Sequence, residues 1–83
     1  MKEKEHYIYK YLRKVQKLQC IAKECAVFWV TVHHMEVGSV IVEVDVRLTH
    51  SSPLENFCMV SYANESECKE TYFRLLNFVK DFM

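Results

Sequence analysis

The histidines and cysteines are the residues of this sequence best suited to bind a metal ion, but their spacing does not bring them together. His33 and His34 are adjacent, so in a β-strand their side chains point to opposite faces and cannot converge on one ion. The cysteines stand at positions 20, 25, 58 and 68, so only Cys20 and Cys25 have the gap of roughly two to four residues seen in zinc sites, and such a site needs three or four converging ligands. The sequence therefore predicts no metal site and no cofactor.

A catalytic site is equally hard to assemble. The chain has a single glycine, Gly38, which leaves no glycine-rich loop to hold a phosphate group. Glu43 and Asp45 are two residues apart, so in a strand their carboxylates share one face. Serine and cysteine side chains are present, but no motif places a general base beside any of them. We therefore expect a binding protein rather than an enzyme.

Composition and charge indicate one small folded domain. The chain has 83 residues, of which 51% are hydrophobic, and this length suits a single domain spanning residues 1–83. The formal net charge is zero, yet residues 1–25 contain seven Lys and Arg against three Glu, whereas residues 26–83 contain four against eight acidic residues. The chain is therefore polarised, with a basic N-terminal segment and an acidic remainder.

The sequence contains no segment suited to a membrane or to secretion. Its longest apolar run, residues 26–30, is far shorter than the roughly 20 residues that a membrane-spanning helix needs. The first fourteen residues lack the apolar core of a signal peptide. We expect a cytoplasmic protein whose four cysteines are reduced.

Residues 26–49 predict a long β-hairpin. They are mostly Val, Ile, Thr, Phe and Trp, which favour strands. Gly38 and Ser39 lie in the middle of the segment and form a signal for a two-residue turn. The predicted strands cover residues 26–37 and 40–49.

This turn determines which side chains share a face. It places Val37 opposite Val40 and Trp29 opposite Leu48, on the face that we expect to be buried. The opposite face combines apolar and charged side chains, with His34 beside Glu43, and such a patch is typical of an interface. We expect this face to bind a partner protein or a second copy of the chain. The expected partner-binding residues are Phe28, Val30, Val32, His34, Glu36, Ile41, Glu43, Asp45 and Arg47.

Two amphipathic helices are predicted to flank the strands. Residues 3–24 and 65–82 both repeat apolar side chains at three- and four-residue spacing. Asn64 precedes the second helix, with Glu67 three residues further on, which is a favourable N-terminal cap. Residues 56–62 predict a third strand, whose inward face the sequence leaves open. The order α-β-β-β-α predicts an α+β two-layer domain, a three-stranded antiparallel sheet with two helices packed on one face.

The exposed side of the first helix offers a second possible binding surface. Lys10, Arg13, Lys14 and Lys17 fall opposite its apolar stripe, among several tyrosines. Such residues can contact phosphate groups, so the alternative prediction is a small nucleic-acid-associated regulator. The zero net charge and the acidic remainder favour a protein partner instead.

The layout resembles that of small phage-encoded inhibitors of Cas nucleases, the anti-CRISPR proteins. The similarity lies in the α-β-β-β-α order, the size and the run Asn64-Glu65-Ser66 at the start of the last helix. The resemblance implies that the partner is a host nucleic-acid-processing enzyme in a bacterial cytoplasm, and it transfers no site residue. We therefore expect a non-enzymatic protein-binding module from a phage or mobile element, an inhibitor whose acidic residues compete for a nucleic-acid site.

Overall fold

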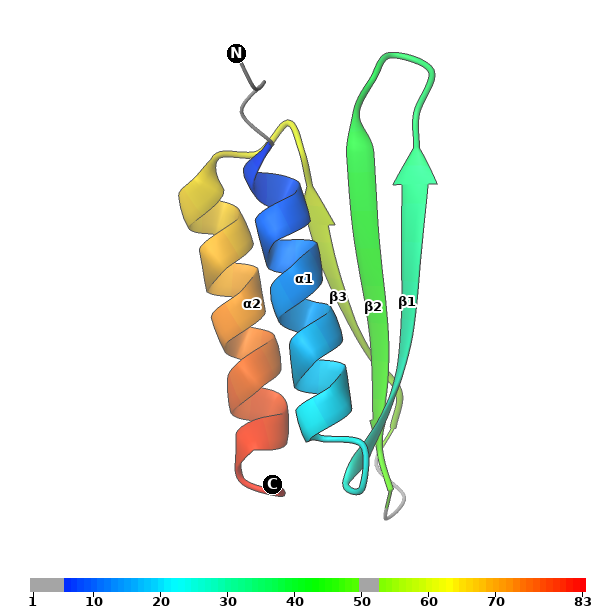
Figure 1. Cartoon of the computed structure of the whole chain (residues 1–83), viewed down its shortest axis with the longest axis vertical. Helices are drawn as coiled ribbons and strands as arrows, with labels where there is room; N and C mark the ends of the chain where they lie inside the picture. The colour runs from blue at the N-terminus through cyan, green and yellow to red at the C-terminus, as the bar shows by residue number, and fades with distance from the viewer. Residues whose placement is uncertain (1–5, 50–52) are drawn as a thin grey trace.

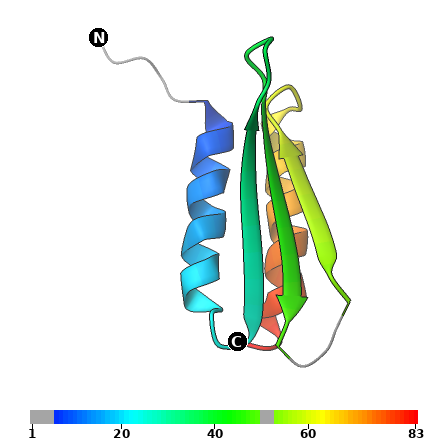
Figure 2. The same cartoon turned by 90° about the vertical axis from the view of Figure 1, so that its right-hand side faces the viewer.

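The computed structural model of the chain describes residues 6–49 and 53–83, and in them two helices flank a three-stranded sheet. The strands are antiparallel and lie in the order β1-β2-β3. Both helices lie on the same side of this sheet (Figure 1, Figure 2), so the predicted α+β two-layer architecture is confirmed. The elements are α1 (Tyr7–Ile21), β1 (Ala26–His34), β2 (Val40–Leu48), β3 (Glu55–Val60) and α2 (Glu65–Lys80).

Helix α1 begins after His6, whose ring Nδ1 accepts a hydrogen bond from the backbone N–H of Ile8 at 3.1 Å. It ends three residues before the predicted position 24, because the chain turns at Ala22. The carbonyl of Ala22 accepts from the N–H groups of both Cys25 and Ala26 at 3.0 Å, which leads the chain directly into β1. The predicted first residues of this helix, 3–5, lie outside the described residues.

Helix α2 has the N-terminal cap that its sequence predicts. The side-chain Oδ1 of Asn64 accepts hydrogen bonds from the N–H of Glu67 at 3.1 Å and from the hydroxyl of Ser66 at 2.6 Å. The bond from Glu67 is the capping contact, because the backbone N–H groups of a first turn have no carbonyl of the same helix four residues before them. The helix ends at Lys80, two residues before the predicted position 82, and Phe82 is exposed beyond its end.

We predict that Asn64→Ala lowers the free energy of unfolding by about 1 kcal/mol, because the first turn of α2 loses its cap. Urea unfolding followed by circular dichroism measures this change. Asn77→Ala is the matched control, since Asn77 is exposed within α2 and alanine is the better helix former there. An equal loss in both variants would contradict a capping role for Asn64.

The hairpin has a different register from the predicted one. Trp29 lies opposite Asp45 rather than Leu48, a shift of three residues. The cause is the connection between the strands, which is a loop of residues 35–39 instead of a two-residue turn. In this loop the N–H of Met35 bonds to the carbonyl of Ser39 at 2.8 Å, and Gly38 adopts a φ of +86°. A shift by an odd number of residues moves every side chain of β1 to the other face of the sheet.

The observed register gives the sheet a consistently apolar side. We call the side that carries the helices the helix-side face, and the opposite side the outer face. On the helix-side face Phe28 lies opposite Val46 and Val30 opposite Val44. The predicted register would have buried Thr31 and His33 here, and the observed one leaves both in solvent. In β3 the inward residues are Phe57 and Met59, which settles the face that the sequence leaves open.

The core lies between this face and the helices, and α1 contacts β1 and β2 whereas α2 contacts β3. Its fully buried side chains come from all layers: Ile8, Val15, Val42, Val44, Val46, Met59, Cys68, Leu75 and Val79. Polar contacts hold the start of α1 against the start of α2. The hydroxyl of Tyr7 donates to the carbonyl of Ala63, and both Lys10 and Tyr11 lie 3.3 Å from a carboxylate oxygen of Glu65. No helix in the described part of the chain is long and apolar enough to span a bilayer.

Candidate protein-binding surface

The outer face of the sheet is covered by neither helix (Figure 1, Figure 2). Three strands supply its side chains, which alternate with those of the helix-side face. Rows of residues cross the sheet from β1 through β2 to β3. The outer-face residues are Val27, Trp29, Thr31, His33, Ile41, Glu43, Asp45, Arg47, Asn56, Cys58 and Val60.

Trp29 is the largest side chain on this face and is 47% exposed. The guanidinium carbon of Arg47 lies 5.9 Å from the centre of its ring, within the range of a cation–π interaction. Asp45 stands directly opposite Trp29 on β2. The indole ring therefore has a cation beside it and a carboxylate at the paired position of the neighbouring strand, and it belongs to a strand rather than to a loop.

The two carboxylates of the outer face are each positioned by a neighbouring strand. The side-chain amide of Asn56 donates to Oδ1 of Asp45 at 2.8 Å, and Nε2 of His33 lies 3.7 Å from Oε2 of Glu43. The predicted neighbour of Glu43 was His34, which is wrong because the register of β1 differs. These contacts tie the acidic residues of β2 to both flanking strands and limit their rotamers.

Cys58 lies opposite Glu43 on the same face, and its thiol is not activated. Burial, and then the nearby carboxylate of Glu43, raise the pKa of Cys58. A raised pKa keeps the sulfur protonated near neutral pH, and the thiolate is the form that attacks electrophiles. The only thiol on the described outer face is therefore a poor nucleophile.

The structure brings together only part of the predicted partner-binding set. Its β2 members, the residues at positions 41, 43, 45 and 47, lie on the outer face as predicted. Its β1 members do not: Phe28 is only 6% exposed, and Val30 and Val32 are half-buried on the helix-side face. His34 is exposed at the end of β1, and Glu36 is exposed in the loop beyond it.

The β1 residues that lie on the outer face, in place of the predicted ones, are Val27, Trp29, Thr31 and His33. A signal for them exists in the sequence of β1. Positions 26, 28, 30 and 32 are all apolar, whereas positions 27, 29, 31 and 33 include a threonine and a histidine. Burying the even set alone avoids placing polar groups in the core.

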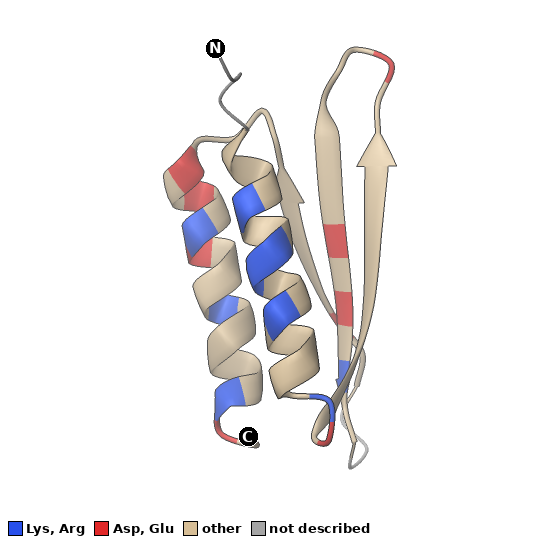
Figure 3. Ribbon diagram, viewed as in Figure 1, with Lys and Arg blue, Asp and Glu red and all other residues tan. Residues whose placement is uncertain are grey.

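The basic residues of α1 form a separate surface on the other side of the molecule (Figure 3). Lys10 and Lys14 line a hollow of about 300 Å³ between the helices, together with Tyr72 and Phe73 of α2. Lys14 and Lys17 line an adjoining hollow of about 270 Å³. We call these two hollows the interhelical groove. Arg13 is exposed on the same helix, and Glu65, paired with Lys10, closes one end of the groove.

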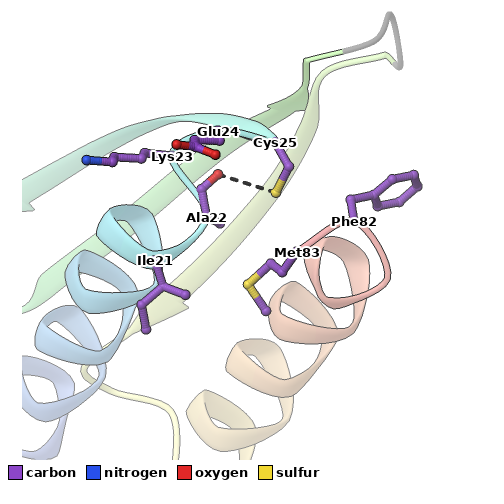
Figure 4. A pocket seen from close by; sticks show the side chains of 7 residues that line it. All are labelled: Ile21, Ala22, Lys23, Glu24, Cys25, Phe82 and Met83. Atoms are coloured by element: carbon purple, nitrogen blue, oxygen red, sulfur yellow. Dashed lines mark hydrogen bonds between the residues drawn. The ribbon is translucent and has the colours of Figure 1, made fainter.

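A third hollow, of about 450 Å³, lies where the C-terminal ends of both helices approach the start of β1 (Figure 4). Ile21 and Met83 face each other across it, and Phe82 turns outward. Its one thiol, Cys25, donates to the carbonyl of Ala22 at 3.3 Å. No histidine and only one acidic side chain, that of Glu24, lines this hollow.

All four cysteines are free, and residues 6–49 and 53–83 contain no cluster of three or more potential metal ligands. Comparisons of the chain with protein-family models, with curated proteins and with solved structures find no match.

Proposed function

We propose that the chain is a non-enzymatic protein-binding module that docks through its outer face onto another protein. The observation that supports this most is Trp29, half-exposed beside Arg47 on a sheet face that neither helix covers. Tryptophan and arginine are the residue types most enriched among the side chains that dominate binding energies at interfaces. Strands position them, so little conformational entropy is lost when a partner covers them.

The polar residues around Trp29 indicate the chemistry of the partner. Glu43 and Asp45 stand in one row along β2 and are held by contacts to β1 and β3. A partner with a basic surface around an apolar pocket would match this arrangement in charge and in shape. We propose a nucleic-acid-processing enzyme of a bacterial host, such as a Cas nuclease, whose nucleic-acid site the module occupies in the cytoplasm. The molecule is then an inhibitor of the kind that a phage or mobile element encodes.

The test is inhibition of a panel of guide-loaded Cas nucleases by the purified chain. We expect the wild type to slow DNA cleavage by at least one of them, and Glu43→Lys with Asp45→Lys to abolish most of that effect, because two attractive contacts become repulsive. Glu24→Lys with Glu70→Lys makes the same charge change at exposed positions outside the outer face and is expected to inhibit like wild type. Equal inhibition by both double variants would contradict docking through the outer face.

The interhelical groove supports a second candidate function, binding of nucleic acid. Here Nζ of Lys14 lies 5.8 Å from the ring centre of Tyr72, and Nζ of Lys69 lies 5.9 Å from that of Phe73. Cations beside aromatic rings suit an unpaired strand, which offers both phosphates and bases. This candidate predicts DNA or RNA binding that falls steeply with salt and is lost when Arg13, Lys14 and Lys17 are neutralised. Such a result would show that the interhelical groove, rather than the outer face, is the functional site.

A further inference from the structure

Strand β1 forms one edge of the sheet, and the hydrogen bonds at its two ends show which of its backbone groups point outward. The N–H of Thr49 bonds to the carbonyl of Cys25, and the N–H of Met35 bonds to the carbonyl of Ser39. In an antiparallel pair, alternate residues turn their backbone groups toward the partner strand. The odd-numbered residues of β1 therefore bond to β2, and its even-numbered residues direct N–H and C=O groups away from the sheet.

Two of the outward groups already have partners within the chain. The N–H of Ala26 bonds to the carbonyl of Ala22 at 3.0 Å, and the carbonyl of Phe28 accepts from the side-chain amide of Gln19 at 3.4 Å. No hydrogen bond within residues 6–49 and 53–83 uses the outward groups of Val30, Val32 or His34. The second half of β1 is thus an open edge, ready to accept a further strand.

This edge lacks the features by which proteins usually block such pairing. Strand β1 is nine residues long and contains no lysine, proline, glycine or carboxylate, whereas exposed edges are commonly protected by charges, prolines or bulges. The opposite edge, β3, has six residues. One of its outward groups, the carbonyl of Val60, already accepts from the N–H of Ala63 at 3.2 Å. The unprotected edge of the sheet is β1.

We propose that two copies of the chain associate through this edge, with the two β1 strands antiparallel and Val32 opposite its own counterpart. In this register Val30 of one copy pairs with His34 of the other. The unused N–H and C=O groups of all three residues then form hydrogen bonds between the copies. This pairing is symmetric about a twofold axis, so both copies use the same surface. It joins the two sheets into one, with all four helices on the same side.

The lysines of α1 leave this edge free for a second copy. Gln19 marks the side of α1 that borders β1, and helical spacing places Leu12 and Gln16 on that side too. Leu12 is only partly buried against the core, so a second copy could cover the remainder. The lysines at positions 10, 14 and 17 lie on the other side of the helix, in the interhelical groove. Two α1 helices can therefore approach across the twofold axis without opposing their lysines.

A consequence is a doubled outer face. Because the joined sheet is continuous, the outer faces of both copies form a single surface with Trp29 twice on it. A partner with two matching sites, or two copies of one partner, would then be held more strongly than one face alone allows. The dimer itself does not depend on the function that we propose for that face.

Proline substitutions at the two edges test the proposal. The N–H of Val32 points outward, so Val32→Pro removes no hydrogen bond within the chain but blocks the edge. Cys58→Pro is the matched control, because the register of β2 and β3 likewise directs the N–H of Cys58 outward. Size exclusion with light scattering is expected to give a dimer for wild type and Cys58→Pro, and a monomer for a folded Val32→Pro. A monomeric wild type, or a dimeric Val32→Pro, would overturn the proposal.

Hydrogen exchange on the wild type gives an answer even if the proline variant does not fold. We expect the amides of Val30, Val32 and His34 to exchange more slowly as the protein concentration rises, because dimerisation protects them. The outward amides of Asn56 and Cys58 on β3 serve as the reference and are expected to stay fast at every concentration. Exchange of the β1 amides that is as fast as this reference, and independent of concentration, would refute pairing through β1.

Discussion

Phe28→Thr is expected to lower the free energy of unfolding by about 3–5 kcal/mol, the usual loss when a buried aromatic ring is truncated, whereas Trp29→Thr lowers it by about 1 kcal/mol. Phe28 is 6% exposed and packs on the helix-side face, and Trp29 is 47% exposed on the outer face. Threonine is favourable in strands, so neither variant loses much strand propensity. The difference therefore reports which face of β1 is buried.

Urea unfolding followed by far-ultraviolet circular dichroism measures both variants, and this signal does not depend on the tryptophan. A loss of about 3–5 kcal/mol is a large part of the total stability of a domain of this size, so Phe28→Thr should be at the margin of folding. The register predicted from the sequence, in which Trp29 faces the core, predicts instead that Trp29→Thr causes the larger loss of stability. A larger loss for Trp29→Thr than for Phe28→Thr would contradict the structure of the hairpin.

The second large effect concerns binding, because Trp29 is the expected centre of the docking surface. Trp29→Thr should weaken the affinity for the partner by about 2 kcal/mol or more, which is roughly a 30-fold higher Kd. Titration calorimetry with the purified partner measures it. The variant is expected to remain folded, so the loss can be assigned to the surface rather than to the fold.

Phe73→Thr is the matched control for this titration. Phe73 is an aromatic residue of nearly equal exposure, 46%, but it belongs to α2 on the other side of the molecule. Its truncation should leave the Kd within about twofold of wild type, since surface changes outside an interface contribute little. A larger loss for Phe73→Thr than for Trp29→Thr would place the interface on the helices.

The sequence predicts the elements whose signals are local. The cap of α2 depends on Asn64 and residues within one turn of it, and β2 has valines at alternate positions that leave one way to face the core. Strand β1 is different, since both of its faces contain bulky apolar residues, and only Thr31 and His33 on one face favour the observed register. The decision lies in the conformation of the loop of residues 35–39 and in packing against α1, which are not local to the strand.

The candidate site was predictable to the same extent. Glu43 and Asp45 lie on the outer face as the sequence indicates, because β2 has an unambiguous pattern. Trp29 is harder to place, because the local signal for its face is limited to Thr31 and His33. The interhelical groove needed still more information, because Tyr72 and Phe73 join the lysines of α1 only through the pairing of two helices that are far apart in the sequence.

The most direct test of docking through the outer face is site-specific photo-crosslinking in bacterial cells, with a photoreactive phenylalanine at Thr31 or at Lys17. Thr31 is exposed on the outer face and Lys17 on α1. We predict that the probe at position 31 captures one defined protein, that the capture is lost when Trp29→Thr is added, and that the probe at position 17 does not capture it. Capture from position 17 alone, or capture from position 31 that survives the loss of Trp29, would contradict the proposal.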